Sequence, residues 1–130
     1  MLEWNGNHGQ TYFYQSELPY DVTQANYGDK GYVSYKVGDK VTNHDAWGLG
    51  TYTYFRDYAV TVQNGIKTPG GPGINMYNSL SVFLNGNGSL KNTIDNDGKE
   101  VNAGNHLQYE CKYNGTQKKQ ETDDALFLQK

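Results

Sequence analysis

Several residue types that mark common protein classes are scarce in this sequence. Cys111 is its single cysteine, which excludes an internal disulfide. The three histidines lie far apart, so no zinc-binding spacing exists, and we expect neither a metal nor a cofactor. No apolar run approaches the length of a membrane span. The first residues, Met1–Trp4, carry no visible signal peptide.

Positive charge is also in short supply. Eleven Lys and Arg residues face fourteen Asp and Glu residues, which gives a net charge of −3. Apart from Lys118 and Lys119, the lysines are scattered, so the chain has no basic stripe. This balance argues against nucleic acid or an anionic membrane as the partner. The glycine-rich segment Thr68–Gly73 lacks both the lysine and the following helix of a phosphate-binding loop.

Sixteen glycines and twelve tyrosines dominate what is present. Such a composition disfavours helices and favours short strands joined by tight turns. Turn signals recur along the chain at Asn64-Gly65, at Asn85–Gly88 and at Asn96–Gly98. The expected strands are Thr11–Glu17, Tyr32–Val37, Gly50–Phe55, Tyr58–Gln63, Leu80–Leu84, Ser89–Ile94 and His106–Tyr113. We therefore predict an all-β chain.

Two all-β architectures fit this pattern about equally well. Asn-Gly turns between alternating strands are typical of a β-sandwich or jelly roll. Very short strands with sharp corners, as in Leu80–Val101, are typical of stacked parallel β-helix coils. We expect a single β domain over residues 1–116, and a polar carboxyl-terminal tail or short helix over residues 117–130.

The stretch Gly9–Asp21, with the sequence GQTYFYQSELPYD, has the most distinctive chemistry. Its alternation predicts a half-buried strand with two different faces. Strict alternation places Tyr12, Tyr14 and Ser16 on one face and Phe13, Gln15 and Glu17 on the other. An aromatic ring, an amide and an acid in one row are suited to a strand that faces a sugar-binding cleft. A strand whose end carries a solvated acid is the alternative.

Four segments together resemble the carboxyl-terminal part of large β-helical, pectate-lyase-like carbohydrate-active proteins. They are GQTYFYQSELPYD, DKGYVSYKV, AWGLGTYTYFRD and LSVFLNGNGSLKNTIDNDG, and the sharpest element within them is Gln15–Tyr20. The chain is similar there to glycoside hydrolase family 55, the exo-β-1,3-glucanases. The resemblance implies a right-handed parallel β-helix, a polysaccharide or oligosaccharide ligand and an extracellular location. Family members are several times longer, with two β-helical halves walling the pocket. A missing upstream β-helical lobe, or self-association, is therefore expected.

In such enzymes the strand end at Glu17 contributes an acidic residue to the sugar cleft. The resemblance makes Glu17 the candidate general acid of inverting glycoside hydrolysis. Nearby aromatic residues that exclude water would favour its protonated form. Gln15 would hold a sugar hydroxyl or orient the acid, and Tyr20 would provide a stacking platform.

A second candidate sugar site lies in the segment NHDAWGLG. It comprises His44, Asp45 and Trp47. His44 equally fits a surface histidine, and Trp47 equally fits a residue that plugs the core. No partner base is identifiable for Glu17. The function is accordingly either a contribution to a β-1,3-glucan hydrolase cleft or that of a non-catalytic carbohydrate-binding or assembly module.

Overall fold

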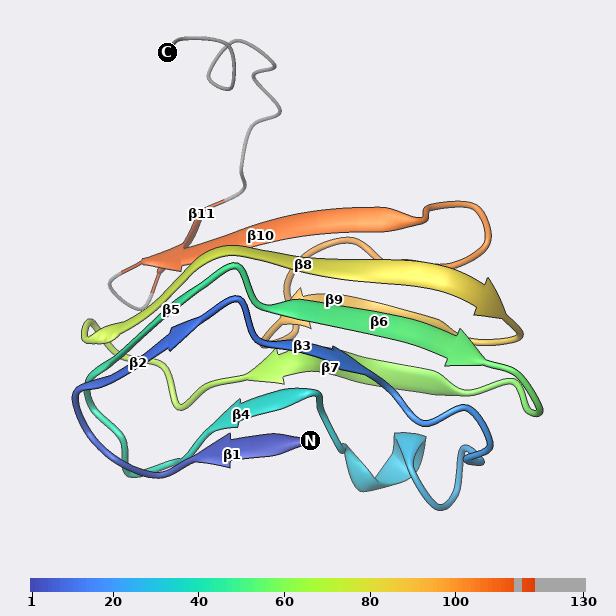
Figure 1. Ribbon diagram of the computed structural model, residues 1–130, viewed down its shortest axis with the longest axis horizontal. Helices are drawn as coiled ribbons and strands as arrows, with labels where there is room; N and C mark the ends of the chain where they lie inside the picture. Colours follow the sequence, from blue (N-terminus) through green and yellow to red (C-terminus); the bar gives the residue numbers. More distant parts are fainter. Residues whose placement is uncertain (114–115, 119–130) are drawn as a thin grey trace, which may run out of the picture.

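A computed structural model describes residues 1–113 and 116–118 (Figure 1). Apart from one 3-10 turn, η1 (Gly28–Lys30), the regular elements of this part are β-strands. They are β1 (Leu2–Trp4), β2 (Gly9–Tyr12), β3 (Gln15–Glu17), β4 (Tyr35–Val37), β5 (His44–Trp47), β6 (Gly50–Phe55), β7 (Thr61–Lys67), β8 (Ile74–Gly86), β9 (Ser89–Ile94), β10 (Leu107–Tyr113) and β11 (Thr116–Lys118). The described part contains no helix long and apolar enough to cross a membrane.

The strands stack as the coils of a parallel β-helix. One sheet has the order β1-β4-β7-β9, and every neighbouring pair in it is parallel. The other side of the molecule is built from β2, β5 and β8, which continue into the row β3, β6 and β8. In Figure 1 the chain can be followed from β2 into β3 and, one coil further, from β5 into β6. The predicted parallel β-helix is thereby confirmed, and the sandwich alternative is not the fold observed.

The last coil ends the parallel stacking. β10 pairs antiparallel with β8, and β11 pairs antiparallel with β10. Gln117 and Lys118 lie in β11, while residues 119–130 of the expected tail lie outside the described residues. Reversing the strand direction pairs the edge of β8 without starting another parallel coil.

The core fills the space between the two walls of strands. Buried and more exposed residues alternate along much of both walls, as the pleat of a strand requires, and the buried positions of β6 and β8 include Thr51, Thr53, Ser79 and Ser81. One cluster comprises Tyr35, Val37, Val41, Ala46, Leu49, Ile66, Ile74, Met76 and Ile94. A second comprises Leu18, Phe55, Val60, Val62, Phe83, Leu90 and Val101. Several of the observed strands differ from expectation, and β1 and β5 were not predicted. β7 runs through Asn64-Gly65, which we had predicted to be a turn, and β8 begins at Ile74 rather than Leu80.

Three consecutive coils bend at stacked positions. Phe13, Gly48 and Asn78 all adopt left-handed backbone conformations, with φ of 54°, 65° and 52°. The amide of Phe13 donates to the carbonyl of Trp47 at 2.8 Å, which ties the corner of one coil to the next. This corner interrupts the predicted continuous strand Thr11–Glu17. Tyr12 is therefore exposed, whereas Tyr14 packs against the core, so the two tyrosines do not share a face as strict alternation predicted.

Candidate functional site

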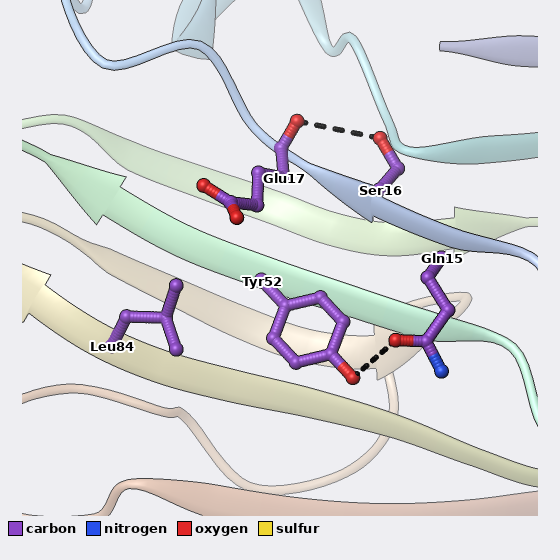
Figure 2. Close-up of a pocket in the computed structure, with 5 residues that line it drawn as sticks. All are labelled: Gln15, Ser16, Glu17, Tyr52 and Leu84. Carbon is purple, nitrogen blue, oxygen red and sulfur yellow. Dashed lines mark hydrogen bonds between the residues drawn. The ribbon is translucent and has the colours of Figure 1, made fainter.

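Glu17 and Gln15 lie on the outer face of β3. Both side chains are exposed, while Ser16 between them is half-buried and the following Leu18 is buried. This part of the predicted alternation is correct because it lies beyond the corner at Phe13. The two side chains line an open groove of about 460 Å³ together with Ser16, Tyr52 and Leu84 (Figure 2). Glu17 also borders a second hollow of about 330 Å³ on the side of Pro19 and Tyr27.

Tyr52 forms the floor of the groove. In the β3–β6 register it is the direct neighbour of Glu17, and its hydroxyl donates a hydrogen bond of 2.6 Å to Oε1 of Gln15. Figure 2 shows the ring reaching along β6 toward Gln15, away from the carboxylate of Glu17. The bond fixes both the ring and the carboxamide, and it leaves the amide nitrogen of Gln15 as the donor offered to a ligand.

Leu84 lines the groove from an irregular part of β8. The β6–β8 register shifts between Thr53 and Tyr54, so that Thr53 pairs with Phe83 and Tyr54 pairs with Asn85. Leu84 is the extra residue of this bulge, and it is 45% exposed. The alternation of β8 directs Leu84 outward, since Phe83 before it is buried. Leu84 supplies the groove with an apolar rim opposite Glu17 (Figure 2).

Tyr20 holds the carboxylate of Glu17. Its hydroxyl donates a short hydrogen bond to Oε2 of Glu17, and this bond raises the pKa of Tyr20. The Tyr20 ring is tilted against that of Tyr54 on β6, with ring centroids 5.3 Å apart. The carboxylate therefore has a defined position, although it stays open to solvent. The aromatic shielding that we expected around Glu17 is not provided by the described residues.

The groove carries one carboxylate. Among the residues that the structure describes, Glu17 is the only acidic one that lines either hollow. Within residues 1–113 and 116–118, no three His, Cys, Asp or Glu side chains come together as a metal site. Proton transfer by Glu17 and hydrogen bonding by Gln15 and Tyr20 are the chemistry that this arrangement offers.

The second predicted cluster lies on β5, on the other side of the corner from the groove. Asp45 accepts a hydrogen bond of 2.8 Å from Asn75. Trp47 is stacked between two tyrosines, 4.8 Å from Tyr12 and 5.1 Å from Tyr77 between ring centroids. Because neighbouring rings cover both of its faces, Trp47 has no free face for a pyranose.

His44 lies inside the protein rather than on its surface. It is 1% exposed, and its Nε2 is 2.8 Å from the hydroxyl of Tyr35, which also contacts Thr11. Burial lowers the pKa of His44, which favours the neutral ring. The surface position that we considered for His44 is wrong because of the alternation of β5. His44 and Ala46 point inward, while Asp45 and Trp47 point outward. His44 therefore does not reach the groove.

Sequence reasoning did not single out Tyr52 and Leu84. A signal for Tyr52 existed, because alternation in the segment Tyr52–Phe55 separates two tyrosines from Thr53 and Phe55. Gly50, two positions before Tyr52, was a further signal, because it leaves room for the Tyr52 ring on the same face of the strand. Alternation in Leu80–Leu84 was a signal for Leu84, because it separates Leu84 from the inward Phe83.

Comparison with known proteins identifies relatives of this β-helix. Residues of the chain are 39% identical over 102 positions to an exo-β-1,3-glucanase of Streptomyces sp. (strain SirexAA-E / ActE), which covers 75% of the chain and 17% of that protein. The structure of sacteLam55A from Streptomyces sp. SirexAA-E matches with a TM-score of 0.75 at 38% identity over 82% of the chain. The resemblance to family 55 exo-β-1,3-glucanases is confirmed. No family model matches the chain.

The match covers only a small part of each relative. It spans about one fifth of the length of the two solved structures that it resembles. The second of these is a variant of sacteLam55A in complex with glucose, with 37% identity and a TM-score of 0.75. The chain thus corresponds to one portion of a larger β-helical protein of this kind.

Proposed function

We propose that this chain forms one wall of the sugar-binding groove of a β-1,3-glucan hydrolase, with Glu17 as the general acid. The observation that carries the proposal is the placement of Glu17, Gln15 and Tyr52 around one open groove on a glucanase-like β-helix. Glucose bound to a variant of the structural relative supports a carbohydrate as the ligand. A polysaccharide substrate in turn supports an extracellular location.

The reaction would proceed with inversion. Glu17 would donate its proton to the oxygen of the scissile bond as that bond breaks. A water molecule would attack the anomeric carbon from the opposite face and lose its proton to a second carboxylate. In inverting enzymes the two carboxyl groups stand roughly 6.5–9.5 Å apart. Tyr20 would hold the Glu17 side chain in place, and the amide of Gln15 would bind a sugar hydroxyl.

The second carboxylate must come from outside the described residues that line the groove. We propose that residues 1–116 belong to a larger β-helical protein and that another lobe, or a second copy, covers this face. Such a wall would exclude water from Glu17, as a general acid requires. It would also supply the base that this groove lacks.

The experiment measures reducing-sugar release from laminarin by the larger β-helical protein that contains this segment, and compares the wild type with Glu17→Gln. Asp39→Asn serves as the matched control. Asp39 is exposed and does not line the groove, and this substitution removes one negative charge just as Glu17→Gln does. We expect Glu17→Gln to lose at least a hundredfold in rate, in line with the loss of general acid catalysis, and Asp39→Asn to keep it. Equal rates for Glu17→Gln and wild type would rule out Glu17 as the acid.

The single carboxylate in the groove also favours a second candidate, a non-catalytic carbohydrate-binding or assembly module. Retention on insoluble β-1,3-glucan without sugar release would identify a binding module. Sedimentation that depends on protein concentration, without any affinity for glucan, would instead indicate an assembly segment.

A further inference from the structure

We propose that the outward face of the Tyr52 ring is a stacking platform for a pyranose, and that Gly50 is the residue that makes this platform possible. The inference rests on the proposed function, because it assigns one sugar subsite within the same groove. It adds two residues that sequence reasoning did not connect with the ligand.

The Tyr52 ring lies down over Gly50. A Cβ atom added at Gly50 would stand 3.0 Å from Cε2 of Tyr52, 3.2 Å from its hydroxyl oxygen and 3.4 Å from Cζ. Distances this short mean that the ring rests against the backbone of the strand at that point. Any side chain at position 50 would lift the ring and change the depth of the groove.

Gln15 holds the far end of the ring. Gln15 is paired with Gly50 in the β3–β6 register, and its Oε1 accepts the hydrogen bond from the Tyr52 hydroxyl at 2.6 Å. The ring is therefore fixed at both ends, by its own Cα on β6 and by an amide on β3. A ring held in advance of binding loses little conformational freedom when a ligand arrives.

Its surroundings make the exposed face suitable for a sugar. Figure 2 shows the ring between the apolar side chain of Leu84 and the amide of Gln15, with Glu17 on the same side of the sheet. A pyranose presents C–H groups on its face and hydroxyls around its edge. Tyr52 would contact the C–H face, while Gln15 and Glu17 would meet the hydroxyls or the glycosidic oxygen. Aromatic rings combined with a few fixed polar groups are typical of such sites.

Other aromatic rings outside the core are placed differently. Trp47 is covered on both faces by Tyr12 and Tyr77. Phe13 also lies over a glycine, Gly48, but it is not among the residues that line the groove. Of the aromatic residues described, Tyr52 is the one that lines the groove with Gln15, Glu17 and Leu84.

The test measures binding of laminari-oligosaccharides to the 130-residue chain by titration calorimetry. We expect Tyr52→Ala to weaken binding about tenfold, and Gly50→Ala to weaken it by a similar factor although every ligand-contacting side chain is still present. The double variant should bind no more weakly than Tyr52→Ala, because both changes remove the same contact. Tyr52→Phe should stay within about threefold of wild type. Tyr58→Ala is the matched control, since Tyr58 is an exposed tyrosine outside the groove.

An NMR readout checks the geometry without any sugar. The Tyr52 ring should shift an α-proton of Gly50 upfield, and Tyr52→Ala should abolish that shift. Wild type that binds oligosaccharide while Tyr52→Ala and Gly50→Ala bind equally well would overturn this inference and leave the proposed function standing. Wild type that binds no β-1,3-glucan, either as this chain or within the larger β-helical protein, would overturn the proposed function, whatever the NMR shift shows.

Discussion

Asp95 and Lys112 form a nearly enclosed ion pair that joins the end of β9 to β10. Their side chains are only 18% and 8% exposed. The carboxylate of Asp95 also accepts hydrogen bonds from the amide and hydroxyl of Thr68, and Lys112 donates to the Thr68 hydroxyl at 2.7 Å. The cluster therefore links the ends of three strands with its polar groups satisfied.

Replacing Lys112 with methionine should destabilise the protein. The change leaves the Asp95 carboxylate without its cation in a poorly solvated position. We expect the free energy of unfolding to fall by about 2 kcal/mol, less than for a fully enclosed pair because Asp95 keeps some contact with solvent. Urea denaturation measures the effect.

Lys91→Met provides the control for this prediction. Lys91 pairs with Glu100 at 2.9 Å, but the two side chains are 43% and 31% exposed. Breaking this pair should cost at most about 0.5 kcal/mol. The double variant Lys112→Met with Asp95→Asn should recover part of the loss. Equal effects of Lys112→Met and Lys91→Met would contradict the role of burial.

His44 should make stability depend on pH. Burial lowers its pKa in the folded protein, and the charge of Asp45 opposes this shift to a smaller degree. The unfolded chain therefore binds a proton at a higher pH than the folded chain does. Stability is complete above the unfolded pKa of about 6.5 and should decline as the pH falls below it.

Urea midpoints at pH 7.5, 6.5 and 5.5 test this dependence. His44→Gln should flatten the decline over this range even if it lowers stability at every pH. Wild-type midpoints that do not change between pH 7.5 and 5.5 would show that His44 accepts a proton in the fold without cost.

A side chain at position 86 should strongly lower the free energy of unfolding. Its φ is 103°, and a Cβ atom there would stand 2.5 Å from the carbonyl oxygen of Phe55. Gly86→Ala combines a strained backbone with a backbone clash, and we expect it to cost at least about 3 kcal/mol. The control is Gly70→Ala, at φ 78° with nothing within 4 Å, which should cost about 1 kcal/mol. Thermal unfolding of both variants distinguishes strain alone from strain with a clash.

Local chemistry was enough to predict much of this fold. Scarce helix formers and repeated Gly and Asn turns predicted an all-β chain, and the alternation of residues 14–18 placed Gln15 and Glu17 together on the outer face. Asn64-Gly65 shows where local chemistry fails. It has a strong turn sequence, yet β7 runs through it because pairing with β4 and β9 on both edges outweighs the local preference.

The candidate site was only partly predictable for a related reason. Glu17 and Gln15 are two residues apart, so the pleat of one strand places them together. Tyr52 meets them from the next coil, a relationship that depends on the register of β3 with β6. Asp45 and Trp47 have suitable chemistry, but the corner at Phe13, Gly48 and Asn78 turns them onto a different surface.

The amino-acid sequence by itself determined which residues alternate along each strand, where glycine permits a bend and which side chains carry sugar-compatible chemistry. These properties depend on covalent structure and on neighbours a few positions away. Only the tertiary structure decided that His44 is buried, that Trp47 is covered on both faces and that the Tyr52 ring rests on Gly50 beside Glu17. Each of these outcomes depends on the order in which the coils stack and on the register between them. Contacts between residues that are distant in the chain determine the stacking order and the register.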